Sequence, residues 1–209
     1  MKISPILFNT DMVKAILDGR KCVTRRLIKP QPKSSVVYHL GQWQETETSY
    51  GGHIRIFPPP YQPGDILYVR ETWSFWPCYD CDNEMCYGGK NNYQHTDGCF
   101  VYKTQRSKVP YEEKWRPSIH MSKEAARIFL KIKSVRVERL QDITADECPM
   151  EGVQLYSGPA GQRARQYRTD FATLWDSTIK PNERSAYGWD ANPWVWVVRF
   201  EPCAKPEGF

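Results

Sequence analysis

Residues 128–140 read IFLKIKSVRVERL, and their side chains alternate between apolar and polar types. Ile128, Leu130 and Ile132 fall on one side of an extended chain, because successive side chains of a strand point to opposite faces. Two valines continue the apolar series after a change of register, which indicates a bulge. The segment is therefore predicted to be a long strand with one buried face.

The sequence on either side of this strand predicts further strands and helices. Additional strands are predicted at residues 66–73, 99–103 and 194–200, and helices at 10–19, within 143–153 and at 165–179. The first helix ends at Gly19, and the second opens with a capping box from Thr144 to Glu147. These elements lack a regular βαβ alternation. The chain is therefore predicted to have an α+β fold with a small β-barrel or strongly bent sheet, flanked by about three helices.

Two stretches interrupt this pattern. Residues 31–62 are rich in Pro, Gly, Ser and Thr, and residues 74–98 are rich in Cys, Asn, Gly and Asp. Such compositions are typical of loops, so both stretches are predicted to be loop insertions, the first of them largely irregular. The sequence shows no internal repeat and no dividing linker, so residues 1–209 are predicted to form a single domain.

The composition limits the class of protein. The 209 residues are 40% hydrophobic and carry a formal net charge of +5, which permits an RNA partner without requiring one. No apolar run approaches the roughly 20 residues of a membrane-spanning helix, and the N-terminus lacks the apolar length of a signal peptide. A cytoplasmic protein without disulfides or a membrane partner is therefore expected. The sequence motifs of serine hydrolases, Walker-type nucleotide triphosphatases and dinucleotide enzymes are absent.

Residues 17–26, LDGRKCVTRR, raise the question of function. Four cations, Arg20, Lys21, Arg25 and Arg26, follow the glycine that ends the first predicted helix. Cations at a helix C-terminus interact favourably with the helix dipole, by a few tenths to about 1 kcal/mol, and this ordinary role explains such a cluster without any function. A phosphate-binding or catalytic role is the alternative.

Four segments together resemble an ASCH domain, a family of the PUA-like superfamily. They are Gly19-Arg20-Lys21-x-x-Thr24-x-Arg26, Gly64-Asp65-x-Leu67-x-Val69, VRVERLQDITADECPMEGV and WVWVVRF. The segments KWRPSIHM and WDANPWVW also resemble parts of longer ASCH proteins from bacteria and their phages. The resemblance implies a small, partly open β-barrel flanked by helices, with a cleft in its side. It also implies RNA or a modified nucleoside as the bound partner.

The resemblance further implies a catalytic trio. Some small ASCH proteins are amidohydrolases that remove the acyl group from N4-acetylcytidine, and their trio corresponds here to Lys21, Thr24 and Glu151, with Glu147 as the weaker choice of carboxylate. Threonine needs an adjacent base to act as a nucleophile, and lysine serves as that base when burial or nearby cations lower its pKa. A neighbouring carboxylate raises the pKa of lysine, so the sequence leaves open which influence prevails.

Substrate-binding residues are also predicted. They are Arg20, Arg26, Arg70, Glu71, Trp115 and Trp189. Arginine recognises phosphates and base edges, and tryptophan offers a ring on which a base stacks. Trp115 and Trp189 lie in loop-like sequence, which favours them as walls of a cleft, whereas aromatic residues at strand spacing are expected in the core.

Four cysteines, Cys78, Cys81, Cys86 and Cys99, form a candidate structural zinc site. Zinc in structural sites takes four thiolate or imidazole ligands, and a metal orders segments that are poor in apolar residues. Against zinc, this segment has one C-x-x-C pair and otherwise irregular spacing, and free thiols in a loop are the alternative. The cleft itself is expected to need no cofactor.

Three functions are compatible with these residues. The principal prediction is the binding of RNA or a modified nucleobase or nucleoside, in a cleft around the G-x-K-x-x-T-x-R turn. The first alternative is an amidohydrolase that deacylates N4-acetylcytidine-type compounds with the Lys/Thr/Glu trio. The second is a ribonuclease, an activity also proposed within ASCH proteins.

Overall fold

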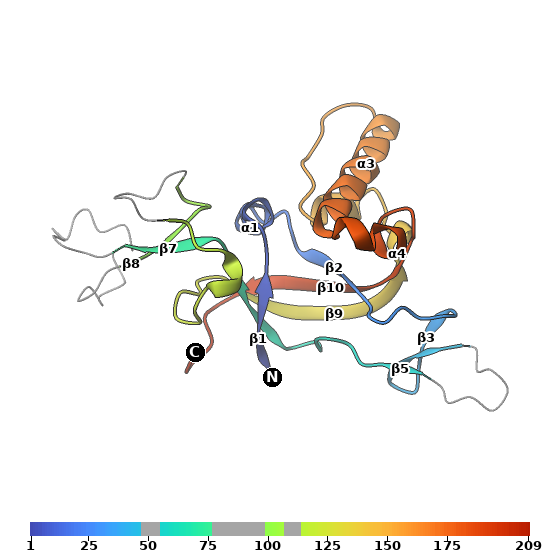
Figure 1. Ribbon diagram of the computed structural model, residues 1–209, viewed down its shortest axis with the longest axis horizontal. Coiled ribbons are helices and arrows are strands. Elements are labelled where there is room, and N and C mark those ends of the chain that lie inside the picture. Colours follow the sequence, from blue (N-terminus) through green and yellow to red (C-terminus); the bar gives the residue numbers. More distant parts are fainter. Residues whose placement is uncertain (47–54, 77–98, 107–113) are drawn as a thin grey trace. The chain divides into compact units, whose positions relative to one another are not determined.

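The computed structural model describes residues 1–46, 55–76, 99–106 and 114–209 (Figure 1). The chain forms two compact units. The first consists of Met1–Leu17, Ile66–Leu130 and Pro202–Phe209, and the second of Asp18–Asp65 and Lys131–Glu201. Among the described residues, no helix combines the length and the apolar character needed to cross a lipid bilayer. The single domain over residues 1–209 stays a prediction.

The largest sheet has the strand order β1-β6-β9-β10-β2. Strand β1 (Ile3–Leu7) runs parallel to β6 (Ile66–Arg70), and β2 (Val23–Leu27) runs antiparallel to β10 (Trp194–Cys203). The long β9 (Phe129–Arg139) confirms the strand predicted from its alternating sequence. Strands β1 and β2 end this order, so the described pairing leaves the sheet open and does not close it into a barrel. Together with the helices, the sheet confirms the predicted α+β class.

The first unit packs a small aromatic core. Its helix α1 (Thr10–Leu17) begins where the side-chain oxygen of Asn9 accepts a hydrogen bond from the amide of Met12, 2.9 Å away. Strands β7 (Trp73–Trp76) and β8 (Cys99–Tyr102) pair antiparallel, and a 3₁₀ turn, η1, spans Ser118–His120. The core contains Ile66, Tyr68, Trp73, Tyr102, Met121, Ala125, Ala126 and Phe129.

A buried carboxylate interrupts the strand that was predicted at residues 66–73, which is two strands in the structure. Glu71 lies between them with an exposed fraction of 0%. The guanidinium of Arg127 donates to both of its carboxylate oxygens, at 2.9 and 3.2 Å, and the hydroxyl of Thr104 donates at 2.7 Å. A buried carboxylate needs such partners because its desolvation is costly. An ion pair therefore fixes this break, and the apolar pattern of the sequence does not reveal it.

The second unit is built around helix α3 (Ala160–Thr178), which packs on one face of β2 and β10. Helix α3 confirms the helix predicted at 165–179, and its side chains Tyr167, Phe171 and Trp175 are buried. They form one hydrophobic cluster with Val23, Leu140, Ile143, Cys148, Val153, Val195 and Val197. The core of this unit therefore lies between α3 and the sheet.

Short helical elements complete the second unit. They are η2 (Leu140–Asp142), α2 (Glu147–Met150), η3 (Pro181–Glu183) and α4 (Arg184–Tyr187). The predicted capping box is present at the start of α2. The hydroxyl of Thr144 accepts the amide of Glu147 at 3.3 Å, and the Glu147 carboxylate accepts the amide of Thr144 at 3.5 Å.

Residues 31–62, the first predicted loop insertion, were expected to be largely irregular, and this prediction is wrong. They contain a three-stranded antiparallel sheet of β3 (Val36–His39), β4 (Gln42–Glu45) and β5 (Ile56–Phe57). The strands are two to four residues long, too short for their alternation to stand out among the surrounding Pro, Gly and Ser residues. Most of the second predicted insertion lies outside the described residues.

Replacing Arg127 with Met should destabilise the protein by about 3 kcal/mol, because it leaves the buried Glu71 carboxylate without its cation. The free energy of unfolding, measured by urea denaturation, tests this expectation. Lys133→Met is the matched control, because the Lys133–Glu201 ion pair is exposed, at 53% and 50% of its side chains. Its effect should stay below about 1 kcal/mol. Equal effects of the two variants would contradict the structural role given to Arg127.

Candidate functional site

Lys21 lies at the edge of the large sheet, where the chain leaves α1 and enters β2. Gly19, with φ of 73°, supplies the left-handed conformation that ends the helix, as predicted. The ammonium of Lys21 donates to the carbonyls of Val23 at 2.8 Å and Glu151 at 2.6 Å, and to the Glu151 carboxylate at 3.0 Å. The Lys21 side chain is completely buried. All three protons of the ammonium therefore have an acceptor.

The edge position of β2 explains one of these acceptors. The carbonyl of Cys22 accepts the amide of Phe200 on β10 at 2.9 Å. Backbone groups alternate in direction along an antiparallel pair, so the carbonyl of Val23 points away from β10. Without Lys21, this carbonyl would lie at the sheet edge with no strand to bind.

Glu151 links the turn to a larger ion network. Its other carboxylate oxygen accepts a hydrogen bond from Arg25 at 3.1 Å, and Arg25 also binds Glu138 at 3.1 Å and Glu147 at 2.6 Å. Arg136 binds both Glu138 and Glu147. The network joins the cations Lys21, Arg25 and Arg136 to the carboxylates Glu138, Glu147 and Glu151. Each charge is offset by a partner, which burial requires.

The network also shifts the ionisation of its members. Burial lowers the pKa of Lys21; Glu151 opposes this effect, and Arg26 and Arg25 add to it. Burial alone would raise the pKa of Glu147, but the hydrogen bond and the charge of Arg25, together with Arg136, hold it below its ordinary value. The question that the sequence left open is therefore answered: the influences that lower the pKa of Lys21 prevail.

The two faces of β2 have different surroundings. Val23 joins the α3 cluster, and the Arg25 guanidinium lies 5.8 Å from the centre of the Phe171 ring. Thr24 and Arg26 are one residue out of step with these two, so they lie on the opposite face of the strand. Thr24 is buried there, with an exposed fraction of 4%.

Two aromatic side chains lie close to Arg26, and a third packs against one of them. Arg26 is directly across from Trp196 on β10, whose ring centre is 6.1 Å from that of Trp43 on β4. Burial lowers the pKa of Arg26, and the nearby Tyr61 and Glu151 oppose this shift. Burial also raises the pKa of Tyr61. We call the group Thr24, Arg26, Trp43, Tyr61 and Trp196 the Arg26 face.

The predicted trio is thus partly assembled. Lys21 and Glu151 are in direct contact, whereas the weaker choice, Glu147, instead binds Arg25 and Arg136. Lys21 donates to three acceptors in this arrangement, so it holds its proton and presents no lone pair to a hydroxyl. To act as a base it must first release one of those hydrogen bonds. The catalytic roles of the trio stay predictions.

The other predicted binding residues have identifiable structural partners. Arg20 binds the carbonyls of Gly152 and Val153, at 3.5 and 3.3 Å, and so anchors the chain after α2. In the first unit, Arg70 binds the carbonyl of Ile119, at 3.4 Å. Also in that unit, Glu71 forms the buried ion pair with Arg127, and Trp115 is half-buried. Substrate contacts of these residues stay predictions.

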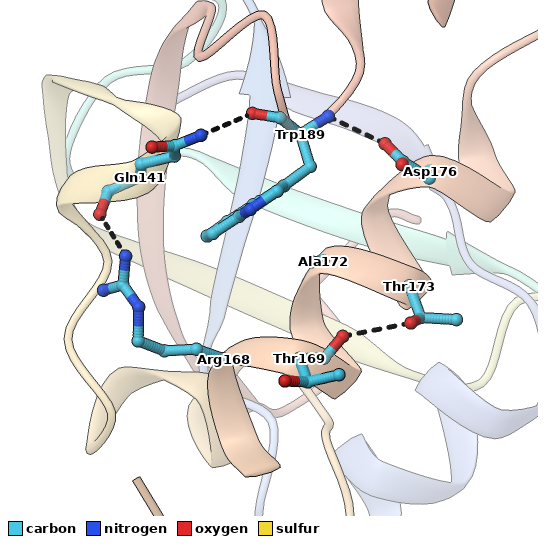
Figure 2. A pocket seen from close by; sticks show the side chains of 7 residues that line it. All are labelled: Gln141, Arg168, Thr169, Ala172, Thr173, Asp176 and Trp189. Atoms are coloured by element: carbon cyan, nitrogen blue, oxygen red, sulfur yellow. Dashed lines mark hydrogen bonds between the residues drawn. The ribbon is translucent and has the colours of Figure 1, made fainter. Parts of the chain in front are cut away.

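Trp189 lines a pocket of about 490 Å³ on the α3 side of the second unit (Figure 2). The other lining residues are Gln141, Arg168, Thr169, Ala172, Thr173 and Asp176. Asp176 accepts the amide of Trp189 at 2.8 Å, the Gln141 side chain donates to the carbonyl of Trp189 at 2.8 Å, and Arg168 donates to the carbonyl of Gln141 at 3.0 Å. These polar groups hold the loop that carries Trp189. Trp189 packs against Phe171 on the α3 side and not on the Arg26 face. Its predicted role as a wall of the cleft around the turn stays a prediction.

Sequence reasoning missed several residues of this region. Arg136 and Glu138 are two positions apart in the VRVER segment, so they lie on one face of β9. That spacing was the available signal for their share in the ion network. Trp43 and Tyr61 fall in a stretch predicted as loop, and Trp196 in one predicted as core. No local pattern therefore indicated that Tyr61 lies near Arg26 or that Trp43 packs against Trp196.

The candidate zinc site falls mainly outside the described residues. Cys78, Cys81 and Cys86 belong to that part of the chain, and Cys99 is the first residue of β8. Structural zinc stays a prediction, as does a cleft that needs no cofactor. Among the described residues, no three His, Cys, Asp or Glu side chains are grouped as metal ligands would be.

Comparison with known proteins gives one structural likeness. No family model and no curated protein match the chain. The chain is similar to a crystal structure of an ASCH domain from Lactobacillus crispatus JV V101, with 12% identity over 96% of this chain and 79% of that chain, and a TM-score of 0.39. A likeness at this level carries no residue roles, which rest on the geometry of this chain.

The lowered pKa of Lys21 makes a prediction for stability against pH. Between the pKa in the folded protein and the ordinary value of 10.5, the unfolded chain holds a proton at Lys21 that the folded chain has lost. The unfolded state binds more protons in this window, so this residue's contribution to the free energy of unfolding rises with pH. Wild type should therefore gain stability relative to Lys21→Met as pH rises towards 10.5.

Urea denaturation of both proteins from neutral pH upwards measures this difference. Lys133→Met, which removes the ammonium of an exposed lysine, is the matched control. A difference between wild type and Lys21→Met that stays constant or shrinks with rising pH would show that Lys21 does not have a lowered pKa.

Proposed function

We propose that the second unit binds a nucleobase, carried by RNA or by a modified nucleoside, on the Arg26 face. The observation that supports this most is the half-buried Arg26, with Tyr61 nearby and the buried Trp196 paired across from it. A guanidinium donates in its own plane to the acceptors of a base edge or to a phosphate, and aromatic rings accept the face of a base. Thr24 adds a hydroxyl that both donates and accepts hydrogen bonds.

The buried ion network supports the same proposal. Apolar side chains of similar volume commonly replace a buried ion pair with no loss of stability, so stability alone is a weak reason for the buried Lys21–Glu151 pair. Groups with perturbed pKa values also cluster at functional sites. Lys21 and Glu151 hold the start of β2, and this fixes the position of Thr24 and Arg26 on the strand. We assign Lys21 and Glu151 a positioning role in binding.

Binding is tested with a short single-stranded RNA and with N4-acetylcytidine, by fluorescence anisotropy and by NMR titration respectively. Arg26→Gln should weaken binding of both by about tenfold or more, because it removes a charged donor to the base. Lys133→Gln, a variant of an exposed lysine in the same unit, should change the affinity by less than about twofold. RNA affinity should also fall as salt rises.

Absence of binding of either probe to wild type at low salt would contradict the proposal. So would equal effects of the two substitutions. A gel of the RNA after the titration separates binding from cleavage: full-length RNA supports a binding function, and metal-independent fragments that disappear in Lys21→Met support the ribonuclease alternative.

A second candidate function is deacylation of N4-acylated cytosine compounds. The 3.0 Å contact between Lys21 and Glu151, together with the lowered pKa of Lys21, favours it. In this reaction Thr24 attacks the acyl carbonyl while neutral Lys21 takes the hydroxyl proton. The bond from carbon to the cytosine nitrogen then breaks, and the amine leaves with that proton. Water hydrolyses the ester left on Thr24 and restores the enzyme.

Turnover of N4-acetylcytidine, followed by release of cytidine, tests this second function. Thr24→Val should abolish turnover, and Lys21→Met and Glu151→Gln should each lower it by at least about a hundredfold. Lys133→Gln is the control, since the Lys133 side chain is 53% exposed and pairs with Glu201. Turnover that survives in Thr24→Val would remove Thr24 as the nucleophile.

A further inference from the structure

The small sheet of β3, β4 and β5 presents an aromatic side chain to solvent. Tyr38 pairs across from Trp43, and Trp43 pairs across from Phe57, so the three rings share one face of this sheet. Tyr38 is 62% exposed, and its ring centre is 5.0 Å from that of Trp43. The two rings are tilted by 51°, so Tyr38 packs against Trp43 while much of its own ring stays accessible to solvent.

This exposed ring is continuous with the Arg26 face. Trp43 contacts Trp196 at 6.1 Å between ring centres, and Trp196 is across from Arg26 on the neighbouring strand. The rings Trp196, Trp43 and Tyr38 therefore form a series that begins beside Arg26 and ends in solvent. All belong to the second unit.

A cation accompanies the series. Arg55 precedes Phe57 by two residues, so it lies on the same face of the small sheet. Its guanidinium lies 5.0 Å from the centre of the Phe57 ring. Arg55 also binds the carbonyl of Gln31 at 3.4 Å, which holds it near the sheet. This face thus combines aromatic rings with a cation, the two features that single-stranded nucleic acids require of a binding surface. The Glu45 carboxylate on the same face accepts the amides of Lys33 and Ser34.

We infer that the Arg26 face takes a base that belongs to a single-stranded polynucleotide, and that a neighbouring base of the same strand stacks on Tyr38. This inference rests on the proposed binding function and adds the class of ligand. A free nucleoside carries a single base, which occupies the Arg26 face. A strand gains the second stacking contact, while Arg55 neutralises one of its phosphates.

The opposite face of the small sheet has a different character. Val37 and Ile56 are 40% and 48% exposed on this face. Each is the cross-strand neighbour of Gln44, on either side of β4. A mixed aliphatic and amide surface suits a protein partner better than a base, which stacks best on a ring. The position of Tyr38, on the face with rings and a cation, therefore favours a polynucleotide for that face.

The test compares two ligands and two neighbouring substitutions. The ligands are N4-acetylcytidine and a single-stranded RNA of about eight nucleotides. This RNA length lies within the range that single-stranded nucleic-acid-binding sites usually cover. Tyr38→Ala should weaken RNA binding about fivefold or more and leave nucleoside binding unchanged, because base stacking accounts for that part of the affinity. Tyr38→Phe keeps the ring and should retain RNA affinity. Val37→Ala, its neighbour on the other face, should change neither affinity.

The outcomes separate this inference from the function on which it rests. RNA affinity that is unchanged in Tyr38→Ala, while Arg26→Gln still weakens both ligands, overturns the role of Tyr38 and leaves nucleobase binding in place. RNA affinity that falls in Val37→Ala and not in Tyr38→Ala overturns the inference in favour of the opposite face. Failure of wild type to bind either ligand removes the proposed function and this inference together.

Discussion

The ammonium of Lys21 is the constraint on which the second unit depends. It sits at the open edge of the sheet, satisfies the outward carbonyl of Val23 and binds both the backbone and the carboxylate of Glu151. One cation thereby ties the start of β2 to the end of α2, although the two residues are 130 positions apart. A buried charge tolerates little displacement, because each lost partner leaves an uncompensated group in a poorly solvated site.

Fixing β2 in this way gives its two faces separate roles. The face towards α3 carries Arg25 into the carboxylates of β9 and α2, and packs beside Phe171. The other face carries Thr24 and Arg26 towards aromatic side chains. Because a slip of one residue would exchange the faces, the register of β2 against β10 also determines which cation meets carboxylates and which meets rings.

The same strand geometry bears on the chemistry that the site can perform. Lys21 and Glu151 are in contact, and burial favours the neutral amine, yet the observed hydrogen bonds are those of an ammonium. A binding role uses this arrangement as it stands. A hydrolytic role requires Lys21 to give up its hydrogen bond to one of the two carbonyls and to accept the proton of the Thr24 hydroxyl instead.

Local sequence determined the elements whose signals lie within a few residues. The alternation in β9, the apolar face of α3, the capping box of α2 and the glycine that ends α1 were all predictable, because each depends on neighbours in the chain. Tertiary structure alone decided the break at Glu71, the strands within residues 31–62 and the placing of Trp196 and Tyr61 beside Arg26. These features arise from partners far apart in sequence, whose contacts no local pattern encodes. The resemblance to ASCH sequences pointed to Lys21 and Glu151, but the direction of the Lys21 pKa depended on burial, which is a property of the folded chain.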